Sequence, residues 1–289
     1  MTIFSYQFMQ YALLGALITG LAAPALGTYL VQRRLALIGD GLGHVALTGV
    51  GVALLTAGSP VLAAMAAAVA GAVVIELVRE RGRTSGDVAL AILFYGGIAG
   101  GVFLTALSAE HTSASLTAYL FGSPLTTSEQ DLVVMGVLGG AVVAVAVGLR
   151  PWLFAVSHDQ EFARVSGLPV RALNLLIAVA AAMTVTVAMR AVGLLLVSAL
   201  MVVPVATAQL LTRTFRATQY LAMAIGVLAA GGGIWVAGTY DTAPGATIVL
   251  LAIAAFAVTT VTTAARRRLR RTGRAERTEI EPPEVVLTR

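Results

Sequence analysis

Long apolar stretches separated by short polar clusters run along most of the chain. A helical span of about 17–25 residues crosses a hydrocarbon core of roughly 30 Å. Residues 41–75 are too long for one span and contain a turn-forming sequence, Thr56-Ala57-Gly58-Ser59-Pro60. The pattern therefore predicts nine transmembrane helices, within residues 8–31, 41–75 (two helices), 88–109, 132–149, 172–189, 191–212, 217–240 and 242–265.

Composition supports the same class. Of the 289 residues, 58% are hydrophobic and only 11% are charged, whereas a soluble domain carries about 25% charged residues. We therefore expect an all-α polytopic protein of the cell membrane. The chain contains no cysteine, so disulfides and thiolate metal sites are excluded.

The arginines predict which way the helices cross. If the C-terminus is cytoplasmic, nine spans place the N-terminus outside. Eighteen of the 19 basic residues, all arginine, then lie in cytoplasmic segments, and only Arg190 lies outside. Cytoplasmic loops are enriched in arginine and lysine. We therefore interpret the pI of about 10.1 as a topology signal and expect no nucleic-acid partner.

The chain divides into a transmembrane domain, residues 1–265, and a basic tail, residues 266–289. The tail is charged, contains Pro282-Pro283 and has little to bury. It is therefore expected to be disordered, and its basic start is suited to contact with anionic membrane lipid.

Asp40 and His44 are the main candidates for chemistry inside a span. Residues four apart share one face of a helix, and a carboxylate with an imidazole suits Zn²⁺ or Mn²⁺. At about 1.5 Å per residue, they lie roughly 9 and 15 Å beyond Arg34. Structural roles are the alternative. Asp40 could cap the helix or pair with Arg34, and His44 could bond to a backbone carbonyl.

The longest internal cytoplasmic segment, residues 150–171, contains a short amphipathic pattern from His158 to Pro169 that Gly167 is expected to end. Its apolar face suits docking on a partner or lying on the membrane surface. Glu76 and Arg79, one turn apart at a span end, are expected to form an interfacial ion pair.

The sequence argues against two function classes. An ion-coupled transporter usually needs intramembrane acids, but residues 172–212 and 217–240 contain none in their apolar stretches. A membrane protease would show His-Glu-x-x-His, which is absent. The sequence also contains no lysine for a Walker A loop. An ATP-driven mechanism therefore requires a partner ATPase, and this chain itself is not expected to be an enzyme.

From about Gly15 to Val261 the chain resembles the permease subunits of ABC importers for divalent metals, the zinc (ZnuB-like) and manganese or iron types. The resemblance rests on six motifs in order. They are residues 33–40 with His44, 118–122, 159–169, 192–197, 203–208, and Tyr240-Asp241 with Pro244-Gly245.

The resemblance implies a homodimer of this chain, two cytoplasmic ATPase subunits and an extracytoplasmic metal-binding protein. It also implies that Asp40 and His44 form a transient site for the transported Zn²⁺ or Mn²⁺, with no tightly bound cofactor. The predicted short helix would then couple to the ATPase, through these residues: Asp159, Glu161, Phe162, Ala163 and Gly167.

The transported metal is harder to predict. Manganese-type relatives often carry proline at the position of Thr48, and Tyr240-Asp241-Thr242 is more similar to zinc-type members. These features favour zinc, with manganese or iron as the alternative, although charge and spacing alone do not separate the metals.

Overall fold

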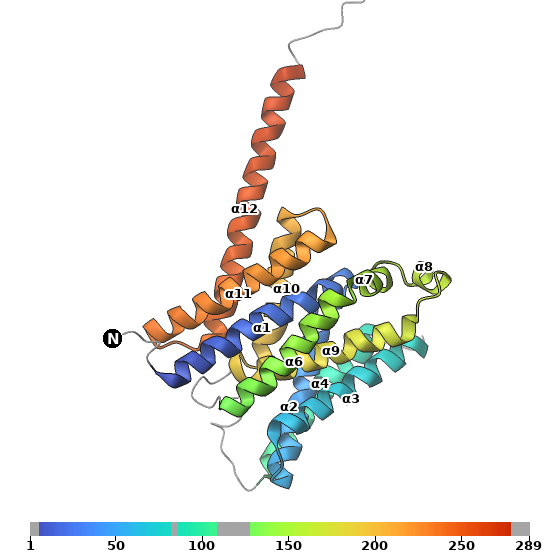
Figure 1. Ribbon diagram of the computed structural model, residues 1–289, viewed down its shortest axis with the longest axis vertical. Coiled ribbons are helices and arrows are strands. Elements are labelled where there is room, and N and C mark those ends of the chain that lie inside the picture. Colours follow the sequence, from blue (N-terminus) through green and yellow to red (C-terminus); the bar gives the residue numbers. More distant parts are fainter. Residues whose placement is uncertain (1–5, 82–85, 109–127, 279–289) are drawn as a thin grey trace, which may run out of the picture.

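The computed structural model describes residues 6–81, 86–108 and 128–278, which form α-helices without strands (Figure 1). The helices are α1 (Gln7–Gln32), α2 (Ile38–Thr56), α3 (Pro60–Arg81), α4 (Gly86–Leu107), α6 (Glu129–Gly148), α7 (Arg150–His158), α8 (Gln160–Val165), α9 (Val170–Ala191), α10 (Leu194–Leu211), α11 (Phe215–Tyr240) and α12 (Pro244–Thr278).

The predicted spans correspond one to one with observed helices. Among the described residues, eight helices are long and apolar enough to cross a membrane, and α10 contains a shorter apolar segment, Val197–Leu211. The all-α polytopic prediction is therefore confirmed, whereas the placement of the two termini across the membrane stays a prediction. Two sequence predictions fall outside the described residues: the motif at 118–122 and, for the basic tail, its last residues, 279–289.

Helices α1, α2 and α9 form the buried centre of the bundle. Apolar side chains gain little from leaving lipid for a helix interface, so association relies on close packing through small residues. Gly20 of α1 and Gly226 of α11 meet backbone to backbone, because a Cβ on Gly226 would lie 2.2 Å from the Gly20 carbonyl oxygen. Gly27 likewise lets α1 approach the backbone of Met201 in α10.

A buried glutamine joins three helices on one side of this centre. Gln219 of α11 is fully buried, and its Nε2 donates to the carbonyl of Ala25 in α1 at 3.0 Å and to that of Ala146 in α6 at 3.2 Å. The Tyr29 hydroxyl also donates to the Ala146 carbonyl. These bonds satisfy polar groups where no water is at hand.

Two turns fix the ends of α2. At its end, Ala57 adopts a left-handed conformation (φ 51°) and α3 begins at Pro60, so the predicted break at residues 56–60 is confirmed. Before α2, Arg34 is also left-handed (φ 59°). The Leu35 N–H donates to the Leu30 carbonyl, which closes α1 with the bond pattern usually built around glycine.

Two features differ from the sequence interpretation. The segment after α6 contains a helix that the pattern did not predict, α7, which begins with Arg150-Pro151 and buries Leu153 and Val156. In addition, α12 does not end near residue 265. It continues through the arginine-rich segment to Thr278 and projects beyond the bundle (Figure 1). Alanine, arginine and leucine favour helix, and the next proline after Pro244 is Pro282. The division into two domains stays a prediction.

The contact between α1 and α11 gives a test of the packing. Gly226→Ala should destabilise the protein by about 1–3 kcal/mol, because the new methyl group meets backbone rather than a movable side chain. The matched control is Gly140→Ala in α6, where an added Cβ meets nothing within 4 Å. The control should leave stability unchanged or raise it by up to about 1 kcal/mol. Thermal unfolding in detergent measures both, and equal behaviour of the two variants would contradict the packing account.

Candidate functional site

Asp40 and His44 lie one turn apart near the start of α2. Asp40 is the third residue of the helix, and its Oδ1 lies 3.9 Å from Nε2 of His44. His44 is 7% exposed, while the Asp40 side chain is 28% exposed. A carboxylate in the first turn is favoured by the positive end of the helix. The structure thus places the two predicted ligands on one face of α2. The Asp40 carboxylate lies nearer the start of the helix and is more exposed than the His44 imidazole.

In the part of the chain that it describes, the structure shows none of the three structural roles considered for the pair: a helix cap, a pair with Arg34, or a bond to a backbone carbonyl. The N-cap position is Leu37, without a side-chain cap, so Asp40 is not the cap residue. Among the described residues, Asp40 forms no ion pair with Arg34, and His44 donates to no backbone carbonyl. The polar contact that each makes there is with the other.

Helix α4 presses directly against the backbone at His44. A Cβ on Gly97 would lie 2.6 Å from the carbonyl carbon of His44. One helical turn before Gly97 in α4, the Phe94 ring meets the His44 imidazole edge to face, with ring centroids 4.4 Å apart and ring planes at 73°. Thr48 donates to the Gly97 carbonyl at 2.8 Å. These contacts leave the imidazole little room to turn away from Asp40.

The glycines next to Asp40 and His44 allow neighbouring helices to pack closely against α2. A Cβ on Gly39 would come within 3.1 Å of the Met201 sulfur in α10, and one on Gly43 would approach the Leu194 carbonyl. Gly41 faces Leu90 of α4, whose Cδ1 would lie 2.7 Å from an added Cβ. Helices α4 and α10 are therefore seated against α2 around the pair.

The pair supplies two ligands of a type that binds divalent metals. Metal–ligand bonds of about 2.1 Å at a tetrahedral angle would place the oxygen and nitrogen about 3.4 Å apart. The observed 3.9 Å is therefore slightly open for a shared ion. No third His, Asp or Glu joins the pair in the described part of the chain. Such a pair suits a weak, passing contact with an ion rather than a storage site.

Positive charge gathers at the end of α2 nearest Asp40. A cavity of about 250 Å³ there is lined by Arg34, Arg79 and apolar side chains. Nearby, Arg33 has a buried Nε and Nη2 without hydrogen-bond partners in the described residues. Burial and the charge of Arg79 lower the pKa of Arg33 to about 10, and the carboxylate of Glu76 partly offsets them.

Glu76 is the single buried acid of this cluster. It is 7% exposed and accepts a hydrogen bond from Arg79 Nη1 at 3.1 Å, so the predicted ion pair is confirmed. One carboxylate faces two guanidiniums, which leaves a net positive charge at this end of the helix. A cation held by Asp40 would therefore meet repulsion in that direction.

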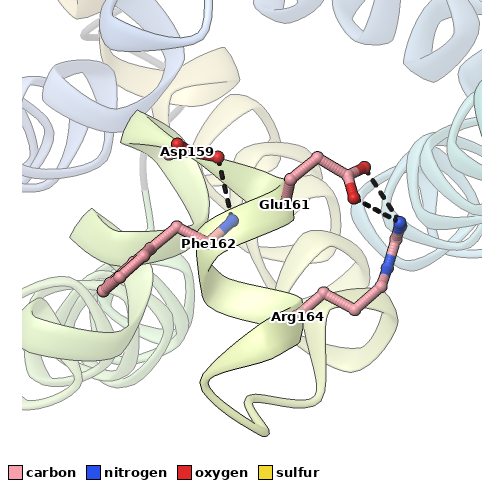
Figure 2. Close-up of polar contacts among 4 residues, drawn as sticks. All are labelled: Asp159, Glu161, Phe162 and Arg164. Carbon is pink, nitrogen blue, oxygen red and sulfur yellow. Dashed lines mark hydrogen bonds and ion pairs between the residues drawn. The ribbon is translucent and has the colours of Figure 1, made fainter.

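The predicted amphipathic helix is α8, six residues long, at the edge of the bundle (Figure 1). Asp159 caps its start by accepting from the Phe162 N–H at 3.0 Å (Figure 2). Gly167 ends it in a left-handed conformation (φ 79°), with the Leu168 N–H donating to the Ala163 carbonyl. Both bonds are the ones that glycine and aspartate favour at helix ends, and the predicted end at Gly167 is confirmed.

The five residues predicted in this segment divide into two groups. Asp159 and Gly167 shape the helix, and Ala163 is fully buried and anchors it. Glu161 and Phe162 point outward: Phe162 is 66% exposed, and Glu161 forms a surface ion pair with Arg164 (Figure 2). The neighbouring Val165 is 88% exposed. An exposed apolar pair beside charge is the kind of surface that partners bind.

A charged cleft of about 660 Å³ adjoins α8. Its lining includes Glu76, Arg79, Arg164 and Asn174. Across its mouth, Arg171 of α9 pairs with Glu80 of α3 at 3.0 Å. The Asn174 Oδ1 is buried without a partner among the described residues. The cleft therefore extends from α8 to α3, the helix that packs against α2.

The sequence reasoning missed the residues that hold the pair in place. Phe94 and Gly97 escaped notice because an aromatic residue and a glycine inside an apolar stretch look like ordinary membrane core. The available signal was Gly97-x-x-x-Gly101, a small-residue motif of close helix pairs. Arg33 was used as a topology marker and as part of the first motif, without a role beside the pair.

Comparisons with known proteins agree with this architecture. The model of the ABC 3 transport family matches residues 5–263. The manganese transport system membrane protein MntC of Halalkalibacterium halodurans is 33% identical, over 87% of this chain and 86% of that one. The high-affinity zinc uptake system membrane protein ZnuB of Haemophilus influenzae is 26% identical, over 87% and 96%. The structure of PsaBC from Streptococcus pneumoniae in complex with a Fab aligns with a TM-score of 0.79 and 26% identity, covering 88% of this chain and 91% of that one.

The chain therefore belongs to the ABC 3 transport family, and it is a membrane permease subunit of a metal ABC transporter rather than an enzyme. The family predicted from the six motifs is confirmed, as is a multi-pass location in the cell membrane. The preference for zinc is not resolved, because relatives named for manganese and for zinc are both similar to this chain.

Proposed function

We propose that this ABC 3 permease forms, as a homodimer, the inward path of a divalent first-row metal ion, with Asp40 and His44 as the transient site on that path. The observation that carries the proposal is the carboxylate and imidazole facing each other at 3.9 Å inside an apolar helix. An ionisable pair at membrane depth is unfavourable unless it serves transport or is otherwise paired.

The geometry favours passage over storage. Two side-chain ligands leave the remaining coordination positions to water, backbone or a second copy of the chain. Binding that is too strong would trap the ion, whereas conduction needs entry and release. The arginines at the end of α2 oppose a cation that leaves Asp40 toward them. Inward release therefore requires a change in the surroundings of α2.

Energy for that change comes, in this proposal, from separate ATPase subunits that dock on α8. A cytoplasmic ATPase needs a firmly held contact that transmits its movement. Ala163 anchors α8 in the bundle, whereas Phe162 and Val165 offer an exposed apolar surface. An extracytoplasmic metal-binding protein would deliver the ion on the opposite face.

Two ions compete as the cargo. Thr48 and the segment Tyr240-Asp241-Thr242 favour zinc, whereas the 33% identity to a manganese permease favours manganese. The Thr48 hydroxyl donates to the Gly97 carbonyl, so Thr48 is occupied in helix packing and says little about coordination. One oxygen and one nitrogen ligand suit both ions. Uptake of each ion, measured with the other as competitor, decides between them.

The first test removes the ligands. In vesicles that contain the complete transporter, Asp40→Asn and His44→Gln should each lower metal uptake by at least about tenfold, because losing even an outer-shell partner of a metal ligand typically costs about 10–100-fold. The matched control is Glu129→Gln, because Glu129 is an exposed acid in the first turn of α6, outside both the pair and the predicted docking segment. Basal ATP hydrolysis should be unchanged in all three variants. Normal metal uptake by Asp40→Asn would overturn the transport role of the pair.

The second test concerns α8. Phe162→Ser should weaken assembly with the ATPase by about tenfold or more, because exposed aromatic residues often dominate such contacts. Leu211→Ser serves as the control, since Leu211 is 53% exposed at the end of α10. Co-purification of the ATPase and metal-stimulated ATP hydrolysis measure the effect. Equal losses in the two variants would argue against α8 as the docking helix.

A further inference from the structure

Two arginines from different parts of the chain converge on one exposed tyrosine. Arg150 is the first residue of α7, and Arg216 lies in the first turn of α11. Their Cζ atoms lie 4.6 and 6.0 Å from the centroid of the Tyr220 ring. Arg150 is held in place by Gln219, whose Oε1 accepts from its Nε at 2.6 Å. The group is therefore built on the buried glutamine that joins α1, α6 and α11.

The positive charge of this group is not compensated. Neither arginine forms an ion pair with a carboxylate in the described part of the chain. There, Arg79, Arg164 and Arg171 form such pairs. The Arg150 Nη2 is buried without a hydrogen-bond partner there. The start of α11 adds the positive end of a 26-residue helix. Two adjacent cations at such an end are unfavourable unless an anion joins them.

The position of the group indicates which anion this is. Arg150 lies two residues after the end of the apolar helix α6, and Tyr220 lies near the start of α11, so both are at the end of a membrane span. Tyr220 is 45% exposed, and Leu228 and Trp235 continue its face of α11 toward the apolar interior, also exposed. Trp152, two residues after Arg150, is exposed as well. This face is suited to lipid, with its aromatic residues at headgroup level.

We propose that Arg150, Arg216 and Tyr220 form a binding site for the phosphodiester of an anionic phospholipid headgroup. Arg216 and the Tyr220 hydroxyl donate to the phosphate oxygens, while Arg150, fixed by Gln219, supplies the second positive charge. Arginine binds phosphate through charge-assisted hydrogen bonds, and basic pockets between membrane helices take anionic headgroups. A lipid held here bridges the start of α11 and the junction of α6 with α7.

Tryptophan fluorescence provides a local test. The chain has two tryptophans, so Trp235→Phe leaves Trp152, two residues after Arg150, as the single tryptophan reporter. The full chain is placed in nanodiscs of phosphatidylcholine with a minority of brominated lipid, either phosphatidylglycerol or phosphatidylcholine. Quenching by the brominated phosphatidylglycerol should correspond to a local concentration about fivefold or more above that of the brominated phosphatidylcholine. Equal quenching by the two lipids would overturn the proposal.

Variants separate the site from general surface charge. Arg216→Gln should remove most of the enrichment, whereas Arg213→Gln, an exposed arginine three residues earlier, should leave it in place. Arg216→Lys keeps the positive charge and should retain part of the lipid enrichment. This variant keeps the test decisive if the glutamine variant folds poorly. Equal losses for the variants at 213 and 216 would contradict a built site.

Two further outcomes identify another occupant. Loss of quenching on adding inorganic phosphate would assign the site to free phosphate and overturn the lipid assignment. Protection of Trp152 from both brominated lipids would place a protein surface over this face, and it would overturn the proposal in favour of an interface.

Discussion

The close approach of helix backbones at small residues is the constraint on which the rest of this bundle depends. Lipid tails are as apolar as leucine, so burial alone does not drive one apolar helix onto another. The helices gain instead from dense contact, which Gly20 with Gly226 and Gly27 with Met201 allow between α1 and its neighbours. The same device at Gly97 seats α4 on the backbone of His44. The candidate metal site is thus positioned by packing contacts rather than by bonds to its ligands.

Polar residues inside the bundle show the complementary constraint, that hydrogen-bonding groups must find partners within the protein. Several threonines do so within their own helix, as Thr19 and Thr184 donate to carbonyls four residues earlier. Gln219 does so by joining three helices. Asp40 and His44 differ, because they face each other at a distance longer than a hydrogen bond. The proposed transport role accounts for this difference, because an ion between the two groups would supply the partner that each lacks.

Sequence patterns predicted what is local. Charged residues marked the ends of the spans because charge is unfavourable in hydrocarbon, and Gly167 marked the end of α8 because glycine adopts its left-handed conformation easily. Contacts between distant segments were out of reach. Phe94 meets His44 through the packing of α4 on α2, and Arg33 interacts with the charges of Arg79 and Glu76 on α3. Helix α7 was not predicted because it begins with an arginine and a proline, which the pattern assigns to a loop.

The route from α8 to Asp40 is short in structural terms. Helix α8 is followed directly by α9, whose Arg171 pairs with Glu80 at the end of α3. Helix α3 packs against α2 at Gly49, where an added Cβ would lie 2.3 Å from the Ala63 carbonyl oxygen. Glu76, one turn before Glu80 on α3, is the acid that balances Arg79 beside the end of α2. Close-packed helices transmit strain to one another, and α3 packs against α9. In the proposed mechanism, a shift of α9 would therefore move Glu76 of α3 relative to Arg33. The charge at the end of α2 would then depend on what is docked at α8.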